Sequence, residues 1–354
     1  MSGLELSIII PTLNEAGRID KLIAGLSAQQ SAPAFEVIIA DGGSQDDTLH
    51  RVQALGQASE LSISVVSSQS GRARQMNEAV FNSSSEALLF LHADTVITDP
   101  SLLYHAHQDM KQAYESCGHE RVAGHFGLHF IREATGYEAA YYFYECKTRL
   151  NRPGCINGDQ GIWIGRDFFN DLQGFDESLG YMEDARLAKK VFEQGEWLTL
   201  SSAVFTSARR FETEGLRARQ TLNALLCNFD EIGMHAFFEQ ADQAYRDQGK
   251  IDYLELKPFL KIVHKVSWHK GISQGFRWWW LTGKYVASNA WQLAFAMDCK
   301  ESFQKELPVS DVEVRHLESY DRFFKPIVES VFGQALAAFA TFCWFYWSLL
   351  FSKS

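Results

Sequence analysis

Polar and acidic side chains follow three strand-like runs of this sequence, at the point where each run ends. Pro11-Thr12-Leu13-Asn14-Glu15 closes the apolar run 6–10, Asp41-Gly42-Gly43-Ser44 closes 37–40, and His92-Ala93-Asp94 closes 88–91. In an open α/β sheet, ligands bind outside the carboxyl ends of the strands. The three motifs are therefore expected at one edge of a sheet, where carboxylates can serve a ligand or a metal.

Two of these acids, Asp41 and Asp94, are placed for binding. Asp41 precedes two glycines, so a ligand can approach the neighbouring backbone closely. A carboxylate at Asp94 could hold a divalent metal that neutralises a diphosphate, and oxygen ligands favour Mg²⁺ or Mn²⁺ over zinc. Gly71-Arg72-Ala73-Arg74 adds cations and a flexible backbone at a predicted helix start, which is a natural anion site.

The elements that must position these motifs alternate between strand and helix. Strand-like runs near 6–10, 35–40, 61–67 and 86–91 are separated by helical patterns near 15–29, 46–55, 71–82 and 100–115. This alternation predicts an α/β fold with a mostly parallel sheet covered on both faces. A second block, from about 121 to 211, adds a strand-like run at 123–131, a Gly158-Asp159-Gln160-Gly161 turn, and a helix that begins at Glu183-Asp184.

The length, charge and cysteine pattern of the chain exclude some classes of function and indicate its compartment. A chain of 354 residues can hold one large α/β domain and an appended region, and its net charge of −11 argues against a nucleic-acid partner. The six cysteines form no CxxC pair, which is typical of reduced core residues in a reducing compartment. The acidic lead 1–5 lacks the pattern of a signal peptide, so the catalytic part is expected in the cytosol.

The last third of the chain differs in character. No acid occurs between Glu255 and Asp298, although this stretch is rich in cations and tryptophan: Lys257, Lys261, Lys265, Lys270, Arg277 and Lys284, with Trp268, Trp278, Trp279, Trp280 and Trp291. This pattern predicts docking on an anionic leaflet; the alternative is a solvated helix face with core tryptophans. Residues 331–351 are almost entirely apolar and long enough to span a bilayer, or else to form a buried helix.

Six motifs in order resemble those of a family 2 glycosyltransferase with the GT-A fold, which has a Rossmann-like, mostly parallel sheet. They are Pro11-Thr12-Leu13-Asn14-Glu15, Asp41-Gly42-Gly43-Ser44, Gly71-Arg72-Ala73, Asn77, His92-Ala93-Asp94 and Glu183-Asp184. Within the family, the chain is similar to a bacterial subgroup with a His-Ala-Asp variant of the DxD motif. The resemblance covers about the first 215 residues, so a catalytic domain is predicted at 1–215. The composition of the rest of the chain predicts a helical extension at 216–330 and a hydrophobic membrane-anchor candidate at 331–351.

The resemblance implies a donor site for a nucleotide-sugar, with a UDP-sugar as the expected donor. The base and ribose pocket would be lined by Pro11, Thr12, Asn14, Glu15 and Asp41, with Gly71 and Arg72 nearby. Asp94 matches the second acid of DxD and would bind Mg²⁺ or Mn²⁺ at the diphosphate. His92 stands where the family usually has Asp, and as a neutral imidazole it could contact the ribose or the metal.

The resemblance also implies an acceptor side. Asp184 matches the proposed general base, with Glu183 beside it, and Asp159 and Gln160 fall in the acceptor and sugar pocket. Arg209 and Arg210 lie where a basic loop can close over the phosphates. A metal or arginines would take the charge on the leaving group while a carboxylate opposite accepts the hydroxyl proton, so a single displacement inverts the anomeric centre. The tail makes a lipid or lipid-linked saccharide, at the cytosolic membrane face, the expected acceptor.

Several alternatives stay open at this point. Nucleotidyl transfer would favour a Gly-rich basic signature after the first strand, which 11–15 lacks, and a NAD-dependent dehydrogenase would need a GxGxxG motif there. A membrane-bound binding or scaffold protein that has lost catalysis is favoured by His92 and opposed by the retained Asp94 and Asp184. Each acid could also be a turn or helix-start residue, and the arginines could be surface cations.

Overall fold

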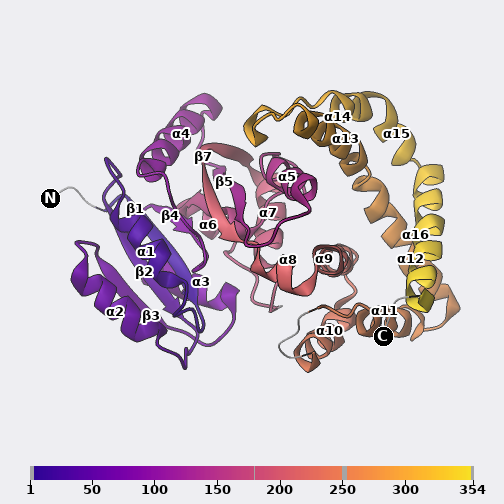
Figure 1. Cartoon of the computed structure of the whole chain (residues 1–354), viewed down its shortest axis with the longest axis horizontal. Helices are drawn as coiled ribbons and strands as arrows, with labels where there is room; N and C mark the ends of the chain where they lie inside the picture. Colours follow the sequence, from indigo (N-terminus) through magenta and orange to yellow (C-terminus); the bar gives the residue numbers. More distant parts are fainter. Residues whose placement is uncertain (1–3, 179, 249–252, 352–354) are drawn as a thin grey trace. The chain divides into compact units, whose positions relative to one another are not determined.

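The computed structural model describes residues 4–178, 180–248 and 253–351, which divide into two compact units (Figure 1). The first unit comprises Met1–Ile131 and Tyr144–Ser207, and the second comprises Arg132–Phe143 and Ala208–Ser354. Helix α5 (Glu138–Lys147) contributes residues to both. The first unit contains the sheet, and the described residues of the second form helices joined by loops, with no strand. This arrangement confirms the predicted α/β fold class, a mostly parallel sheet flanked by helices with a helical, partly hydrophobic C-terminal extension.

The first unit is built on a seven-stranded sheet with the order β3-β2-β1-β4-β6-β5-β7. Neighbouring strands are parallel, except that β6 runs antiparallel to both β4 and β5. Strands β1 and β2 end in register, with Thr12 paired to Asp41, so their terminal loops lie side by side. The strands are β1 (Leu6–Thr12), β2 (Phe35–Asp41), β3 (Ile63–Ser67), β4 (Ala87–Phe90), β5 (Val122–Ile131), β6 (Ile162–Gly165) and β7 (Glu196–Ser207).

Helices cover both faces of this sheet. Alternate strand residues point to opposite faces, and both sets are apolar and buried against helices. Ile8 and Ile10 of β1 belong to one core, together with residues of α1 and α4, whereas Ile9 belongs to a second core with residues of α3 and α7. Burial on both faces explains why the strands read as continuous apolar runs. The helices are α1 (Ile19–Ser27), α2 (Thr48–Ala58), α3 (Arg72–Phe81), α4 (Leu102–Cys117), α6 (Arg166–Asp171) and α7 (Glu183–Gln194), with a 3₁₀ turn at Gly158–Gln160.

The second unit ends in the apolar helix α16, which is long and apolar enough to cross a membrane. Only 6% of its most apolar stretch is buried, so it is not a core helix. It lies beside α12 (Figure 1). The helices are α8 (Arg209–Glu214), α9 (Leu216–Glu231), α10 (His235–Asp247), α11 (Lys257–Trp268), α12 (Ile272–Ser288), α13 (Trp291–Gln304), α14 (Arg315–Ser319), the π-helix η3 (Tyr320–Phe324), α15 (Lys325–Val328) and α16 (Val331–Phe351), with a 3₁₀ turn at Val309–Asp311.

Candidate active site

The loops that follow β1 and β2 are interlocked by hydrogen bonds. The buried Asp41 carboxylate accepts from the backbone N–H groups of Gly43 (2.9 Å) and Ser44 (3.0 Å) and from Ser44 Oγ (2.6 Å). Asn14, in the left-handed region with φ 56°, donates its N–H to Ser44 Oγ (2.9 Å) and accepts from the N–H of Gln45 (2.8 Å). The carboxylate of Asp41 thus shapes the turn that follows it, and its part in binding a base stays a prediction.

Gln75 of α3 holds the ends of both strands. Its buried side-chain amide donates to the carbonyl oxygens of Thr12 (2.8 Å) and Ala40 (2.7 Å) and accepts from the N–H of Gly71 (3.3 Å). A Cβ added at Gly42 would lie 2.9 Å from Gln75 Oε1, so glycine lets the loop close on this amide. Gln75 is not among the predicted site residues, and its place on the apolar side of the 71–82 helical pattern is the one sequence signal that points to it.

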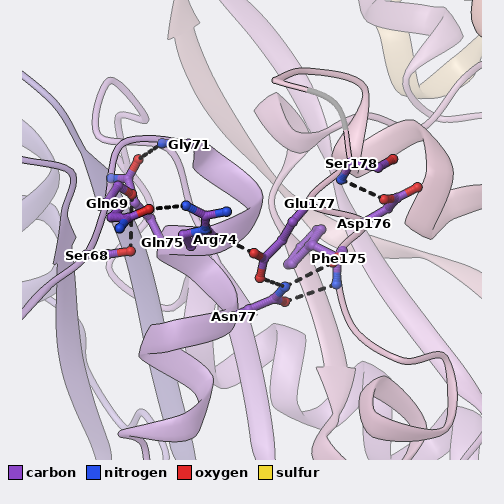
Figure 2. A network of polar contacts seen from close by, with 10 residues as sticks. All are labelled: Ser68, Gln69, Gly71, Arg74, Gln75, Asn77, Phe175, Asp176, Glu177 and Ser178. Atoms are coloured by element: carbon purple, nitrogen blue, oxygen red, sulfur yellow. Dashed lines mark hydrogen bonds and ion pairs between the residues drawn. The ribbon is translucent and has the colours of Figure 1, made fainter. Parts of the chain in front are cut away.

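Helix α3 also holds the loop that leads to α7, as Figure 2 shows. Asn77 Nδ2 donates to the carbonyl oxygen of Phe175 (2.9 Å) and to Glu177 Oε1 (2.9 Å), and Asn77 Oδ1 accepts from the N–H of Phe175 (3.0 Å). Arg74 Nε donates to Glu177 Oε2 (3.1 Å). One helix therefore positions both the strand-end loops and the segment that precedes the predicted general base.

Helix α7 begins at Glu183 and carries both acids of the predicted pair in its first turn. Met182, just before it, has φ 72°, a conformation that costs a non-glycine residue free energy and is common at functional sites. Glu183 Oε1 accepts from Arg72 Nη1 at 3.0 Å, whereas Asp184 Oδ2 accepts from the N–H of Gly158 at 2.6 Å. The two adjacent acids thus serve different partners, one on α3 and one on the 158–160 turn.

Arg72 and Glu183 form an ion pair with unequal exposure. The Glu183 side chain is 1% exposed and that of Arg72 is 45% exposed. Burial raises the pKa of Glu183; the Arg72 charge opposes this shift and Asp184 adds to it. Burial lowers the pKa of Arg72, but the attraction of Glu183 and Asp184 outweighs it and the net shift is upward. Arg72 therefore stays charged, with one side fixed to Glu183 and the other open to an anion.

His92, Asp159 and Asp184 converge around Gly158. His92 Nδ1 lies 2.8 Å from Asp159 Oδ1. A Cβ added at Gly158 would lie 2.6 Å from His92 Nε2 and 3.2 Å from Asp184 Oδ2, so only glycine fits between these side chains. His92, which the resemblance predicts at the first position of DxD, thus lies beside the predicted base and is oriented by Asp159.

Gln160, at the end of the same turn, is buried and bonded within the protein. Its Nε2 donates to the carbonyl oxygen of Thr148 (2.9 Å) and to His125 Nδ1 (3.0 Å), and its Oε1 accepts from the N–H of Asn157 (3.0 Å). Burial lowers the pKa of His125, which favours the neutral ring that this acceptor role requires. These contacts give Gln160 a role in fixing the turn, while its predicted contact with a sugar stays a prediction.

Asp94 is the predicted metal ligand, and it lies two residues after His92 in the loop that follows β4. It is partly buried, and among the described residues its carboxylate has no hydrogen-bond or ion-pair partner. The described residues contain no group of three His, Cys, Asp or Glu that could hold a metal by themselves. Mg²⁺ is commonly bound by one or two carboxylates together with substrate phosphates. Asp94 therefore fits as a single protein ligand whose metal would be completed by phosphate and water.

The remaining predicted residues separate into two places. Pro11 and Thr12 are the buried last residues of β1, and Glu15 is paired with Arg18 in the loop that follows. Arg209 and Arg210 are exposed at the start of α8, in the second unit. The first unit thus brings together all the predicted residues except these two arginines, whose role at the phosphates stays a prediction.

The sheet and the site are typical of α/β proteins that bind a ligand at the carboxyl ends of parallel strands. Comparison with known sequences indicates which family of such proteins the chain resembles. Residues 7–172 match the model of glycosyl transferase family 2. This segment covers β1 to α6 and includes the loops with Asp41, Arg72, His92 and Asp94. The prediction of a family 2 glycosyltransferase domain is thereby supported, and the His-Ala-Asp subgroup stays a prediction.

The individual proteins that this chain resembles have low sequence identity to it. The "Uncharacterized glycosyltransferase YfnE" of Bacillus subtilis (strain 168) is 29% identical over 108 residues, so the chain covers 28% of that protein's length and 30% of its own. Two solved structures are similar at low identity. S. aureus TarS 1-349 in complex with UDP-GlcNAc has 15% identity and a TM-score of 0.46 over 86% of this chain and 92% of that one. The mannosyltransferase PcManGT from Pyrobaculum calidifontis, in complex with GDP-Man and Mn2+, has 17% identity and a TM-score of 0.47 over 99% and 88%.

Proposed function

We propose that this chain transfers a sugar from a nucleotide-sugar donor to a hydroxyl acceptor, with inversion at the anomeric carbon. The observation that carries the proposal is the cluster around Gly158, where the Asp184 carboxylate and His92 meet, while Glu183 beside Asp184 is paired with the half-exposed Arg72. The family 2 match over 7–172 supports the same reaction. A UDP-sugar is the donor that we propose first.

Each residue of the cluster has a distinct proposed role. Asp184, whose carboxylate is held in place by the N–H of Gly158, accepts the proton of the acceptor hydroxyl as that hydroxyl attacks. Arg72, oriented by Glu183, and His92, oriented by Asp159, face the charge that develops on the departing nucleotide. Asp94 would hold Mg²⁺ or Mn²⁺, and that metal, when bound, neutralises diphosphate charge.

We further propose that the acceptor is a lipid or a lipid-linked saccharide and that the enzyme works at the cytosolic face of a membrane. Two observations support this location: the largely exposed apolar helix α16, and the stretch 256–297, which contains no acid. Arg209 and Arg210 are proposed to close over the donor phosphates, as their exposure at the start of α8 allows.

Asp184→Asn tests the reaction. We expect donor affinity near that of the wild type and turnover lower by roughly two to four powers of ten, since the amide keeps the shape and loses the basicity. Donor binding is measured by calorimetry and turnover by release of the nucleoside diphosphate, with UDP-GlcNAc and GDP-Man as the first donors and with and without Mn²⁺. Asp167→Asn, at an exposed acid of α6, is the matched control. Turnover equal to that of the control would remove Asp184 from the mechanism, and no binding of any nucleotide-sugar would overturn the proposed function.

A further inference from the structure

Helix α16 turns its large apolar side chains outward, which reverses the pattern of a helix on a water-soluble surface. Phe332 is 77% exposed and Leu350 is 73% exposed, whereas Phe345 is 1% exposed. The exposed positions recur at helical spacing along the whole helix, and Leu336, Phe339 and Trp347 are among them. They therefore form one continuous apolar stripe on one side of α16, larger than the isolated apolar side chains of an ordinary surface.

Two polar side chains of α16 are bonded within the second unit. Tyr346 Oη accepts from Trp268 Nε1 at 2.6 Å and lies 3.0 Å from His264 Nδ1, both on α11. Gln334 Nε2 donates to the carbonyl oxygen of Glu329 at 2.7 Å. The outer side of α16 therefore exposes large apolar side chains, while its Tyr346 hydroxyl and Gln334 amide are bonded within the protein, which indicates that the outer side faces an apolar environment.

Helix α16 packs along α12 and is therefore an integral part of the second unit. A Cβ added at Gly283 of α12 would lie 2.5 Å from Ala338 Cβ, so the two helices approach each other closely at this glycine. The Trp279 ring of α12 lies 5.1 Å from the rings of both Phe342 and Phe345. The outer stripe of α16 is thus held in a fixed orientation relative to α12.

The segment that leads into α16 extends the apolar surface and carries two exposed cations, with Asp321 and Glu329 as its acids. Phe323 and Phe324 of η3 and Ile327 of α15 are exposed, and the exposed cations Arg322 and Lys325 lie among them. The Arg322 guanidinium lies 5.1 Å from the centroid of the Phe323 ring. Aromatic and basic residues side by side are typical of the headgroup region of a membrane, where anionic lipids attract Lys and Arg.

We propose that the outer stripe of α16, together with Phe323, Phe324 and Ile327, is a lipid face that rests in the plane of an anionic leaflet, so that α16 does not span the bilayer. This inference rests on the proposed membrane location and gives it a geometry. A spanning α16 would draw its partner α12 into the hydrocarbon with the exposed Arg277 and Lys284, which is costly for a charged side chain. Because Ala338, Phe342 and Phe345 on its inner side pack against α12, α16 presents only its outer stripe to a bilayer.

The depth of three labels in the bilayer tests this orientation. Cys343 is a free, exposed thiol near the middle of the stripe. An environment-sensitive dye is attached there, or at Phe332→Cys or Leu350→Cys in a Cys343→Ser background, and the full chain is mixed with vesicles of phosphatidylcholine and phosphatidylglycerol. We expect all three dyes to be shielded from aqueous iodide and to have the same shallow depth by lipid-attached quenchers. A dye at Lys21→Cys, on the exposed side of α1 in the first unit, is the control and should stay accessible.

Three other results would overturn the inference. A deep dye at Cys343 between shallow dyes at the two ends would show a span, because a helix of 21 residues is about 31 Å long and matches the hydrocarbon thickness. Shielding without vesicles that increases with protein concentration would show that a second copy covers the stripe. Accessibility of all three dyes in the presence of vesicles would show that the stripe has no lipid contact.

The cations provide a second, independent test. Arg322→Gln and Lys325→Gln should each weaken binding to the anionic vesicles about fivefold and leave binding to pure phosphatidylcholine vesicles unchanged. Lys21→Gln is the matched control and should change neither. Equal binding of all three variants to anionic vesicles would remove the proposed charge contribution. Vesicle binding is measured without donor and donor binding without vesicles, so a failure of the lipid face and a failure of the proposed transferase reaction are distinguishable.

Discussion

The substitution Gly158→Ala tests the geometry of the candidate site without removing any functional group. The added methyl would lie 2.6 Å from His92 Nε2 and 3.2 Å from Asp184 Oδ2. Because a relaxed carbon contact is about 3.5 Å, the imidazole or the turn must move by roughly 0.9 Å. Such overpacking typically costs about 1–3 kcal/mol of folding free energy.

The same displacement should have a larger effect on catalysis than on folding. A shift of about 1 Å in a reacting group can lower the rate about a hundredfold. We therefore expect kcat/KM to fall by about two powers of ten in Gly158→Ala, with the thermal midpoint lower by only a few degrees. Donor affinity should also fall, since His92 faces the proposed donor side, and this separates the variant from Asp184→Asn.

Gly17→Ala is the matched control, because a Cβ there would meet no atom within 4 Å and the residue has no positive φ. Turnover is measured with the donor, UDP-GlcNAc or GDP-Man, that the wild type uses, and unfolding is followed by circular dichroism. If Gly158→Ala folds and turns over like Gly17→Ala, then His92 and Asp184 do not work around this glycine, and the proposed reaction centre is misplaced.

Three further predictions follow from the site. Asp94→Ala should abolish the Mn²⁺ response of donor binding measured by calorimetry, and an unchanged response would remove Asp94 as the metal ligand. The pKa of Glu183 is higher in the folded chain than in the unfolded chain, where it is near 4.5. The free energy of unfolding of the wild type should therefore fall relative to that of Glu183→Gln as pH rises from the unfolded-state pKa to the folded-state pKa. A difference that stays flat or rises with pH in denaturant titrations would contradict the raised pKa. Asn77→Ala should cost about 1–3 kcal/mol of unfolding free energy and lower turnover, whereas Asn82→Ala, which loses one exposed bond, should change neither, and equal effects would refute the role of Asn77.

The sheet and the strand-end motifs could be predicted because their signals are local. The strands β1, β2 and β4 are short apolar runs that end in polar residues, and their parallel order follows from the helices between them. The acids Asp41 and Asp94 were placed at the correct strand ends for the same reason. The prediction left open what each carboxylate contacts: Asp41 is bonded within its own turn, whereas Asp94 has no partner among the described residues.

The contacts that assemble the site could not be predicted, because they join residues distant in sequence. Gln75 bonds to strand ends 35 and 63 positions away, and Asn77 to a loop 98 positions away. Gly158 looked like an ordinary turn glycine, and only the positions of His92 and Asp184 show why a side chain is excluded there. Helix α16 likewise looked apolar all round, and the inward direction of Tyr346 depends on its contacts with α11.

The ion pair between Arg72 and Glu183 is better explained by positioning than by stability. A buried carboxylate loses its hydration, and a buried ion pair often contributes little net folding free energy. Here the loss of hydration falls mainly on the Glu183 side chain, which is 1% exposed, while the Arg72 side chain is 45% exposed. A buried acid that holds one face of a guanidinium leaves the opposite face ordered before any ligand arrives. Because less side-chain freedom is then lost on binding, this arrangement suits the contact with the charged leaving group that we propose for Arg72.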